Sequence, residues 1–282
     1  AERDYRQIKV YSSLKPSLVN SIARSAHSRG LRLSGHVPAF MSAEEFIRAG
    51  ADEIQHLNML FLNFLTDVAP DTRDMTRFTA VAEFAREIEP NQPRVRDLIR
   101  LMQEHHTSLD PTVAIFEGMF SGKPNDPPPG MERYLSRVPP QVARSWLSGA
   151  LPIPEGQEAA YQAALPAMLK LLKAVYDAGI PIVAGTDAMP GFALYRELEL
   201  YVEAGLSPVE ALRTATLTPA QIMGADHVLG SPAAGQFADL ILVDGRPDKN
   251  IGDLERVQTV IKNGVFYQAA ELQQSLGIQP IV

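Results

Sequence analysis

Short apolar segments alternate with helix-forming segments through the first 56 residues, and this alternation constrains the fold more than any other feature. Residues 7–11 (QIKVY), 31–36 and 53–56 have the apolar and β-branched composition of buried strands. A helix-forming segment fills each gap. Ser42, with Glu45 three residues later, gives the second of these segments the capping box of a helix start. Short strands that alternate with helices predict an α/β fold with a parallel sheet or barrel.

The middle of the chain continues this alternation with one interruption. Residues 107–117 and 180–187 resemble further strands, and mainly helical sequence precedes each of them, at 60–106 and 158–178. The interruption is the segment 121–156, which holds eight of the chain's 22 prolines. Because proline fixes φ and removes a backbone donor, we predict that this segment is irregular and forms a lid-like insert.

The amino-acid composition and the hydrophobic pattern of the chain change near residue 225. Beyond it, the alternating, β-branched stretches QFADLILVDG (236–245) and VQTVIKNGVFY (257–267) predict strands, and Asn263-Gly264 is a two-residue hairpin signal. We therefore predict a β/α portion over residues 1–224 and a small β module over residues 225–282.

Composition excludes several classes of partner. Of the 282 residues, 45% are hydrophobic and 21% are charged, which is typical of a globular enzyme. The formal net charge is −7 and no basic block occurs, so no nucleic-acid partner is expected. No apolar run reaches the length of a membrane span, so we expect a soluble protein without a membrane partner, either cytoplasmic or periplasmic/secreted. The absence of cysteine excludes disulfides and thiolate metal sites.

Four residues with metal-binding or acid–base chemistry share one position, the C-terminal end of a predicted strand. They are Lys9, His36, His56 and Asp187. Because the C-terminal ends of the strands meet on one face of a β/α barrel, residues far apart in sequence are expected to converge there. Neutral imidazole and carboxylate groups suit zinc, manganese, cobalt or iron(II). The pattern therefore predicts a divalent metal site on that face.

Each of these residues also has a purely structural interpretation. His36 can be a hydrogen-bonded core histidine, Asp187 can cap the helix that follows it, and Lys9 can pair with an acid in an apolar strand. The matching strand-end positions favour metal ligation. Tyr11 lies two residues past Lys9, on the same face of the strand, where it is predicted to contact a substrate.

Several stretches together resemble a known family. They are YRQIKVYSSL (5–14), RLSGHV (32–37), GADEIQHL (50–57), IPIVAGTDA (180–188), ELELYVEAGLSPVEALRTATLTPAQIMG (197–224) and LGSPAAGQFADLILVDGRPDKNI (229–251). With them the chain resembles, over nearly its whole length, the amidohydrolase superfamily, in the branch of imidazolonepropionase-like enzymes and metal-dependent prolidases. The resemblance implies a TIM-type (β/α)8 barrel flanked by a β-sandwich. The change of composition near residue 225 is consistent with the β-sandwich.

The resemblance also implies a role for each candidate. Lys9 would be carboxylated by CO2 and would bridge two metal ions, and His36 and His56 would be ligands from the next two strands. Asp187 would be the last-strand ligand and would carry the proton. The cofactor would be one or two divalent ions, zinc first, with manganese, cobalt or iron as alternatives. Such an enzyme attacks an amide or related C–N or ester bond of a small molecule with a metal-bound hydroxide, and a dipeptide or N-acyl amino acid is the expected substrate.

One motif of the family, a first-strand His-x-His, is absent. The six histidines stand at positions 27, 36, 56, 105, 106 and 227, and no two are separated by a single residue. We therefore expect a partial barrel, strands four to eight, whose N-terminal part comes from the same or another polypeptide; a homo-oligomer is left open. Two alternative functions stay open. One is a single-metal cyclic amidohydrolase or deaminase, and the other is a non-catalytic fragment that lacks half of the metal site.

Overall fold

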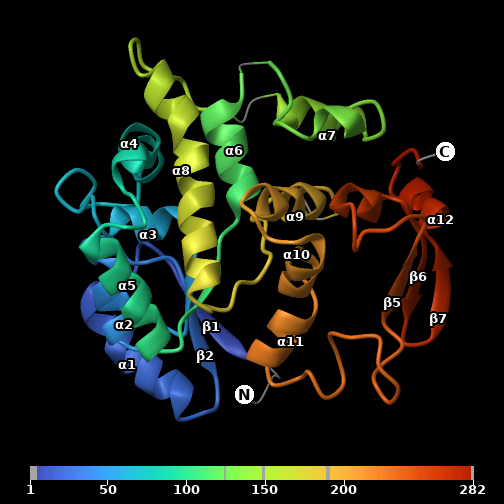
Figure 1. The fold of residues 1–282 in the computed structure, drawn as a ribbon, viewed down its shortest axis with the longest axis horizontal. Helices are drawn as coiled ribbons and strands as arrows, with labels where there is room; N and C mark the ends of the chain where they lie inside the picture. Colours follow the sequence, from blue (N-terminus) through green and yellow to red (C-terminus); the bar gives the residue numbers. More distant parts are fainter. Residues whose placement is uncertain (1–4, 124, 148–149, 189–190, 281–282) are drawn as a thin grey trace. The chain divides into compact units, whose positions relative to one another are not determined.

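A computed structural model describes residues 5–123, 125–147, 150–188 and 191–280 (Figure 1). Internal contacts divide the chain into two compact units. The first unit comprises Ala1–Val113 and Ile153–Gly185, and the second comprises Ala114–Pro152 and Thr186–Val282. The boundary near residue 225, which was predicted from the change of composition and hydrophobic pattern, stays a prediction.

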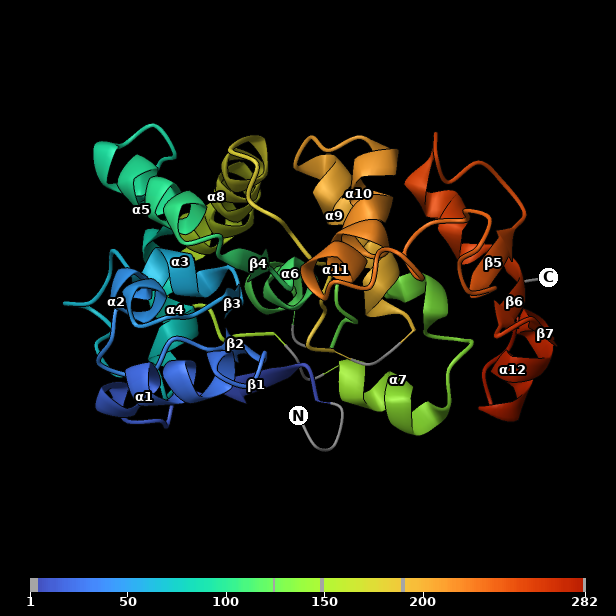
Figure 2. The ribbon, with the colours of Figure 1, turned by 90° about the horizontal axis from the view of Figure 1, so that it is seen from below.

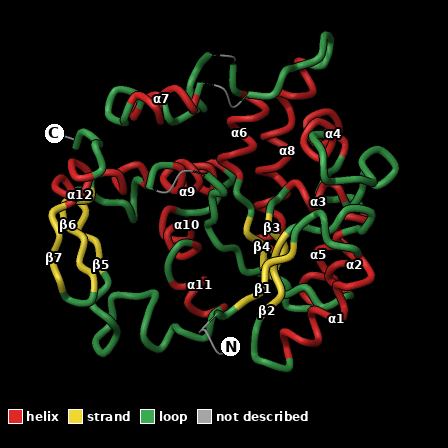
Figure 3. The backbone as a smooth tube through the Cα atoms, turned by 180° about the vertical axis from the view of Figure 1, so that it is seen from behind, coloured by secondary structure: helices red, strands yellow, loops and turns green. Residues whose placement is uncertain are grey.

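A parallel sheet of four strands forms the centre of the first unit (Figures 1 and 3). In pairing order the strands are β1 (Gln7–Val10), β2 (Arg32–Gly35), β3 (Glu53–Gln55) and β4 (Ser108–Asp110). Each strand lies within a segment that was predicted to be a strand. The parallel pairing confirms the predicted mixed α/β fold.

Helices connect these strands and pack around them. They are α1 (Pro16–His27), α2 (Ala43–Arg48), α3 (Asn58–Leu62), α4 (Thr76–Phe84), α5 (Pro93–Glu104) and α8 (Glu158–Asp177), with the short 3-10 helix η1 (Ala85–Glu87). α2 begins with the predicted capping box. Ser42 Oγ accepts a hydrogen bond from the backbone N–H of Glu45 at 3.1 Å, and Glu45 Oε2 accepts one from the backbone N–H of Ser42 at 2.8 Å.

The register of the sheet sorts its side chains into two faces. One row of paired positions is buried and consists of Val10, Gly35, Ile54 and Leu109. The neighbouring row, on the other face, is polar and consists of Lys9, Ser34, Glu53 and Ser108. Glu53 is buried in this row, and its Oε2 accepts a hydrogen bond from Ser108 Oγ at 3.2 Å. Tyr11 and His36 continue the polar face beyond the ends of β1 and β2.

Two predicted strands differ from the structure. The prediction of a strand over 107–117 is wrong beyond Asp110, because α6 (Val113–Ser121) occupies the second half of that segment. Periodicity cannot separate a short apolar run of a strand from one of a buried helix. The predicted strand 180–187 is reduced to a single bridge between Ile182 and Leu109. Among the described residues of this unit the sheet therefore has four strands and one bridge, and the predicted barrel is not confirmed.

The described residues of the proline-rich segment 121–156 are mainly irregular, as predicted, but the segment also holds two short helical pieces. It contains the 3-10 helix η2 (Glu132–Tyr134) and α7 (Pro140–Trp146), and prolines occupy the cap and the first helical position of α7. Proline is tolerated at a helix start because the N–H there has no helical partner. The ring of buried Tyr134 lies 4.9 Å from that of Phe192, and Trp146 contacts Phe192 edge-on at 5.7 Å. The insert thus packs against Phe192 in a small hydrophobic core that also includes Tyr195 and Ile278.

The second unit continues with α9 (Ala193–Glu203), α10 (Pro208–Thr214) and α11 (Leu217–Ile222). α10 begins at Ser207 and Glu210 with a second capping box, which confirms the predicted helix start. Among all the helices described in either unit, none is both long enough and apolar enough to cross a membrane.

A small antiparallel sheet lies near the C-terminus of the chain (Figure 2). Its order is β5 (Leu240–Val243), β6 (Val257–Lys262) and β7 (Val265–Gln268), accompanied by η3 (Ile251–Glu255) and α12 (Ala269–Ser275). Asn263 and Gly264 have φ values of +53° and +77° and form the predicted hairpin between β6 and β7. Ile241, Leu242 and Phe266 of this sheet are exposed. The described residues supply this one sheet, and the second sheet of a sandwich stays a prediction.

Candidate functional site

Two histidine rings lie next to each other at the ends of neighbouring strands. The ring centroids of His36, after β2, and His56, after β3, are 4.5 Å apart in an edge-on arrangement. The ring of Tyr11, after β1, lies 4.2 Å from that of His36. Both histidines are buried, with 5% and 6% of their surface exposed, whereas Tyr11 is 50% exposed. The predicted convergence of the two histidines is therefore seen, and their role as ligands stays a prediction.

The backbone at His56 explains how the two rings meet. Simple alternation along β3 would direct His56 to the face opposite that of Gln55. His56 instead has a φ of +112°, and this turn of the chain places its ring beside that of His36. A non-glycine residue with such a φ is strained, and strain of this kind gathers at functional sites.

The surroundings of His36 keep its ring neutral. Burial, followed by the nearby His56, Lys9 and Arg77, lowers the pKa of His36 to about 3. A neutral imidazole is the form that coordinates a metal, because its lone pair is available. The Nδ1 atom of His36 is buried and has no hydrogen-bond partner among the described residues. This atom is therefore available to an incoming ligand.

Thr112, which no sequence motif signals, contacts the second histidine. Its Oγ1 lies 2.7 Å from Nδ1 of His56, and both residues are buried. When Nδ1 carries the proton and donates it to Thr112, the lone pair of the ring lies on Nε2 and the ring orientation is fixed. Thr112 has a φ of +49°, which is unusual for a β-branched residue. The sequence Pro111-Thr112-Val113 gives no sign of this conformation.

Replacing Thr112 with valine is expected to weaken metal binding about 10- to 100-fold, because His56 loses the hydrogen bond that orients its ring. Valine keeps the branched shape, so the local backbone is little changed. Competition with a chromogenic chelator measures the affinity.

Thr107→Val is the matched control for this substitution. Thr107 is also buried and donates a hydrogen bond to the carbonyl of Ala51 at 3.3 Å, but it lies at the opposite end of β4. Its replacement is expected to leave the metal affinity unchanged. Equal affinity in the wild-type protein and in Thr112→Val would contradict the role of Thr112.

Lys9 occupies the position in β1 that pairs with Ser34 of β2, and its side chain is exposed. Lys9 is exposed because β1 is the edge strand of the described sheet, and its predicted role as a metal ligand stays a prediction. The charge of Lys9 still contributes to the lowered pKa of His36. Carboxylation by CO2 requires a neutral amine, which burial favours. The described residues do not supply this burial, and the carboxylation of Lys9 stays a prediction.

Asp187 belongs to the second unit, whereas the two histidines belong to the first. It is exposed and has a φ of +47°. The cap position of α9 is occupied by Phe192, so the alternative that Asp187 caps this helix is wrong. Its role as a metal ligand and proton carrier stays a prediction.

The residues of the first unit fit a divalent metal as part of a site. Two adjacent imidazoles, one of them neutral with a buried and available Nδ1, are ligands of the kind that zinc prefers. Within the described ranges, no three His, Asp or Glu side chains are grouped so that they could hold an ion. Two of the predicted ligands thus lie side by side, and their binding of a metal stays a prediction.

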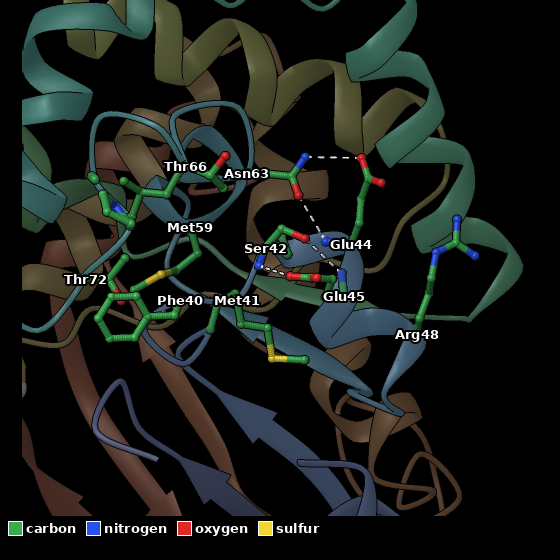
Figure 4. Close-up of a pocket in the computed structure, with 15 residues that line it drawn as sticks. Phe40, Met41, Ser42, Glu44, Glu45, Arg48, Met59, Asn63, Thr66 and Thr72 are labelled. Carbon is green, nitrogen blue, oxygen red and sulfur yellow. Dashed lines mark hydrogen bonds between the residues drawn. The ribbon is translucent and has the colours of Figure 1, made fainter. Parts of the chain in front are cut away.

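A pocket of about 560 Å³ opens beside the loops that follow β2 and β3 (Figure 4). Phe40 and Met59 contribute apolar side chains to its lining. Asn63 Oδ1 accepts a hydrogen bond from the backbone N–H of Glu44 at 3.0 Å, and Asn63 Nδ2 donates one to Glu44 Oε1 at 3.3 Å. These polar groups are engaged with each other, and none of the predicted ligands lines the pocket. We therefore do not assign this pocket to the histidine site.

Comparison with known proteins identifies a family for part of the chain. Residues 150–266 match the amidohydrolase family. An imidazolonepropionase of Geobacillus kaustophilus (strain HTA426) is 32% identical over 96 residues, which are 31% of this chain and 23% of that protein. The match thus spans about a quarter of the length of this curated relative.

Solved structures extend the likeness in fold to almost the whole chain. A Xaa-Pro dipeptidase with bound methionine has a TM-score of 0.59 at 20% identity, over 95% of this chain and 56% of that chain. A bottromycin amidohydrolase has a TM-score of 0.64 at 20% identity, over 98% of this chain and 60% of that chain. The chain therefore spans little more than half the length of these neighbours. Residues 150–266 thus match the amidohydrolase family, and nearly the whole chain is similar in fold to these solved structures of a Xaa-Pro dipeptidase and an amidohydrolase.

Proposed function

We propose that this chain forms part of the active site of a metal-dependent hydrolase that cleaves a carbon–nitrogen bond of a small molecule. The observation that carries the proposal is the pair of buried histidines, His36 and His56, whose rings lie 4.5 Å apart at the ends of neighbouring parallel strands. The match of residues 150–266 to the amidohydrolase family supports the reaction class.

In the proposed reaction, water adds across the C–N bond of an amide. When bound, a divalent ion, zinc first with manganese, cobalt or iron as alternatives, makes a coordinated water more acidic and polarises the carbonyl group. His36 and His56 would hold such an ion, with Thr112 orienting the ring of His56. Asp187 takes a proton from the attacking water and delivers it to the leaving nitrogen. A carbon–oxygen bond forms and the carbon–nitrogen bond breaks, so the products are a carboxylic acid and an amine.

The proposed substrate is a dipeptide or an N-acyl amino acid. A structural neighbour described as a Xaa-Pro dipeptidase supports a peptide-like substrate. Tyr11 is proposed to contact the substrate, because its ring lies against His36 while half of its surface stays exposed.

The role of Lys9 distinguishes two versions of the proposed function. With two ions, a carboxylated Lys9 would help to hold both; with one ion, as in a cyclic amidohydrolase or deaminase, Lys9 would not be a ligand. Lys9 is exposed because β1 is the edge strand of the described sheet, so its exposure does not decide between the two versions.

The remaining ligands are proposed to come from outside these 282 residues, in the same polypeptide or in another subunit. The proposal rests on the small number of candidate ligands, because the described residues offer no group of three His, Asp or Glu side chains that could hold an ion. In this arrangement residues 1–224 are the barrel portion of the enzyme and residues 225–282 are the sandwich portion.

Metal content and hydrolysis, measured on one preparation, test the proposal. The protein is purified as the cell makes it, without chelator, and its metal content is measured by plasma mass spectrometry. We expect one or two ions per chain, and hydrolysis of a panel of dipeptides, N-acyl amino acids and cyclic amides that stops when the ions are removed. Zinc added back is expected to restore the activity.

Two outcomes would overturn the proposal. Hydrolysis that survives complete removal of metal would contradict a metal-dependent reaction. A stably bound ion without turnover of any amide on the panel would give the chain a non-catalytic role. The number of ions separates the two versions, since two ions per chain support the bridging lysine and one ion supports the single-ion site.

A further inference from the structure

The second unit contains an apolar pocket of about 550 Å³. Helices α6, α7 and α9 line it together with residues 128–131 of the insert. Its apolar side chains include Ile115, Met119, Trp146 and Phe192. Pockets of about 300 to 1,000 Å³ with mainly apolar walls are typical binding sites for small molecules.

The aromatic side chains that line the pocket are held in place by packing against each other and against a buried tyrosine. Trp146 meets Phe192 edge-on, with 5.7 Å between ring centroids, and Phe192 in turn lies 4.9 Å from the buried ring of Tyr134. Aromatic pairs in this geometry are rigid and favourable. Met119 and Met131 also line the pocket and have flexible side chains that adapt to the shape of a ligand. The pocket therefore combines a fixed aromatic wall with adaptable aliphatic groups.

The charge at the pocket disfavours an anionic ligand. Arg196 is the ionisable residue among the described lining residues, and its guanidinium is already engaged. It donates two hydrogen bonds to Glu117, at 2.7 and 2.8 Å, one to Glu199 at 3.1 Å and one to Glu203 at 2.8 Å. Glu199 also forms an ion pair with Arg133 at 2.9 Å, so three carboxylates lie beside two guanidinium groups and the local charge is negative. A carboxylate group in this pocket would find no unpaired cation among the described lining residues and would be repelled by the neighbouring carboxylates.

The pocket also reaches the residue next to the proposed proton carrier. Ala188, which follows Asp187, is one of the lining residues. We infer that the pocket binds an uncharged, bulky apolar group of the substrate, an aromatic or branched aliphatic side chain or acyl group beside the bond that is cleaved. The inference rests on the proposed function and narrows its substrate class from dipeptides and N-acyl amino acids in general to those that carry such a group.

Tryptophan fluorescence tests binding without any need for turnover. Trp146 is the single tryptophan of the 282 residues, and the difference between the wild-type protein and Trp146→Phe isolates its emission. N-acetylphenylalaninamide is the neutral probe, and N-acetylglutamate is the anionic one. We expect a saturable change of the Trp146 emission with the neutral probe and no saturable change with the anionic probe.

Two substitutions are expected to remove this response. Ile115→Glu places a carboxylate in the pocket and is expected to weaken binding of the neutral probe at least about tenfold, because a buried charge without a partner is costly. Gly118→Leu fills the pocket instead, since a Cβ at Gly118 already lies 3.3 Å from Pro128 Cβ across the lining. Val209→Glu, at an exposed position of α10 outside the pocket, is the control and is expected to leave binding unchanged.

Steady-state kinetics separates the failure of this inference from the failure of the proposed function. In Ile115→Glu, kcat/KM is expected to fall at least about tenfold for a substrate with a phenylalanyl group and to stay within about twofold for its glycyl counterpart, because only the former loses apolar burial. Absence of a saturable change with the neutral probe, equal binding of the anionic probe, or unchanged binding in both pocket variants would overturn the inference whether or not the protein hydrolyses amides. Selective binding of the neutral probe by a protein that hydrolyses none of the amides would overturn the proposed function alone.

Discussion

Replacing His36 or His56 with asparagine is expected to remove the bound ion and to lower kcat/KM at least about a thousandfold, because the site loses one of the two imidazoles that are proposed to hold the metal. Asparagine is polar and shorter than histidine, so it fits each buried position without a steric clash. It also tolerates a positive φ better than most residues. The substitution at His56, where φ is +112°, therefore tests the lost ligand rather than the backbone. Metal content and kcat/KM are measured on the same preparations.

His106→Asn is the matched control for these variants. His106 also has a positive φ, of +54°, but it is exposed just beyond α5. Its replacement is expected to leave metal content and kcat/KM within about twofold of the wild-type values, as for most exposed positions away from a site. Wild-type metal content and activity in both His36→Asn and His56→Asn would show that the two rings are a structural pair and not ligands.

Replacing Gly35 with alanine is expected to lower the free energy of unfolding by more than about 3 kcal/mol, since both the backbone conformation and the space forbid a side chain. Gly35 has a φ of +134°, and a Cβ at this position would lie 2.1 Å from the carbonyl oxygen of Val10 and 2.8 Å from its nitrogen. These atoms belong to the paired backbone of β1, so they cannot move aside without breaking the β1–β2 pairing. The next residue, His36, donates its backbone N–H to the same carbonyl of Val10 at 3.2 Å. Urea unfolding followed by circular dichroism measures the loss.

Gly30→Ala separates the two causes of this loss. Gly30 also has a positive φ, of +67°, but a Cβ there would meet nothing within 4 Å. Its replacement is expected to cost only the backbone term of about 1 kcal/mol. Equal losses for Gly30→Ala and Gly35→Ala would show that the close approach of Val10 to Gly35 has no energetic consequence.

Local signals in the sequence predicted the parts of the fold that depend on neighbouring residues. The capping boxes that begin at Ser42 and Ser207 are formed between residues three positions apart, and both are present. The hairpin at Asn263-Gly264 needs two consecutive positive φ values, which these two residue types adopt readily. The location of His36 and His56 at one edge of the sheet also followed from the sequence, because parallel strands end on the same side. The contact between their rings depends on the φ of +112° at His56, which the sequence does not predict.

Features that depend on contacts distant in sequence were not predictable. The apolar run 113–117 lies in helix α6 rather than in a strand, and its composition suits either. The prolines of the insert mark the start of α7 as well as irregular chain, and only the core around Phe192 reveals which residues pack. The exposure of Lys9 depends on whether another strand covers β1. The contact between His56 and Thr112 joins residues that are 56 positions apart.

The hydrogen bond between His56 and Thr112 joins two residues whose backbones both have positive φ, +112° and +49°. Each residue is buried, so neither conformation relaxes easily while the other is held. The conformational entropy of the His56 ring is therefore lost when the chain folds and not when an ion binds. Such a preorganised imidazole gives up little conformational entropy on coordination. Ordering the ring then subtracts little from the free energy of metal binding. An ion whose preferred bond lengths do not match the fixed position of the ring cannot be bound by moving the ring.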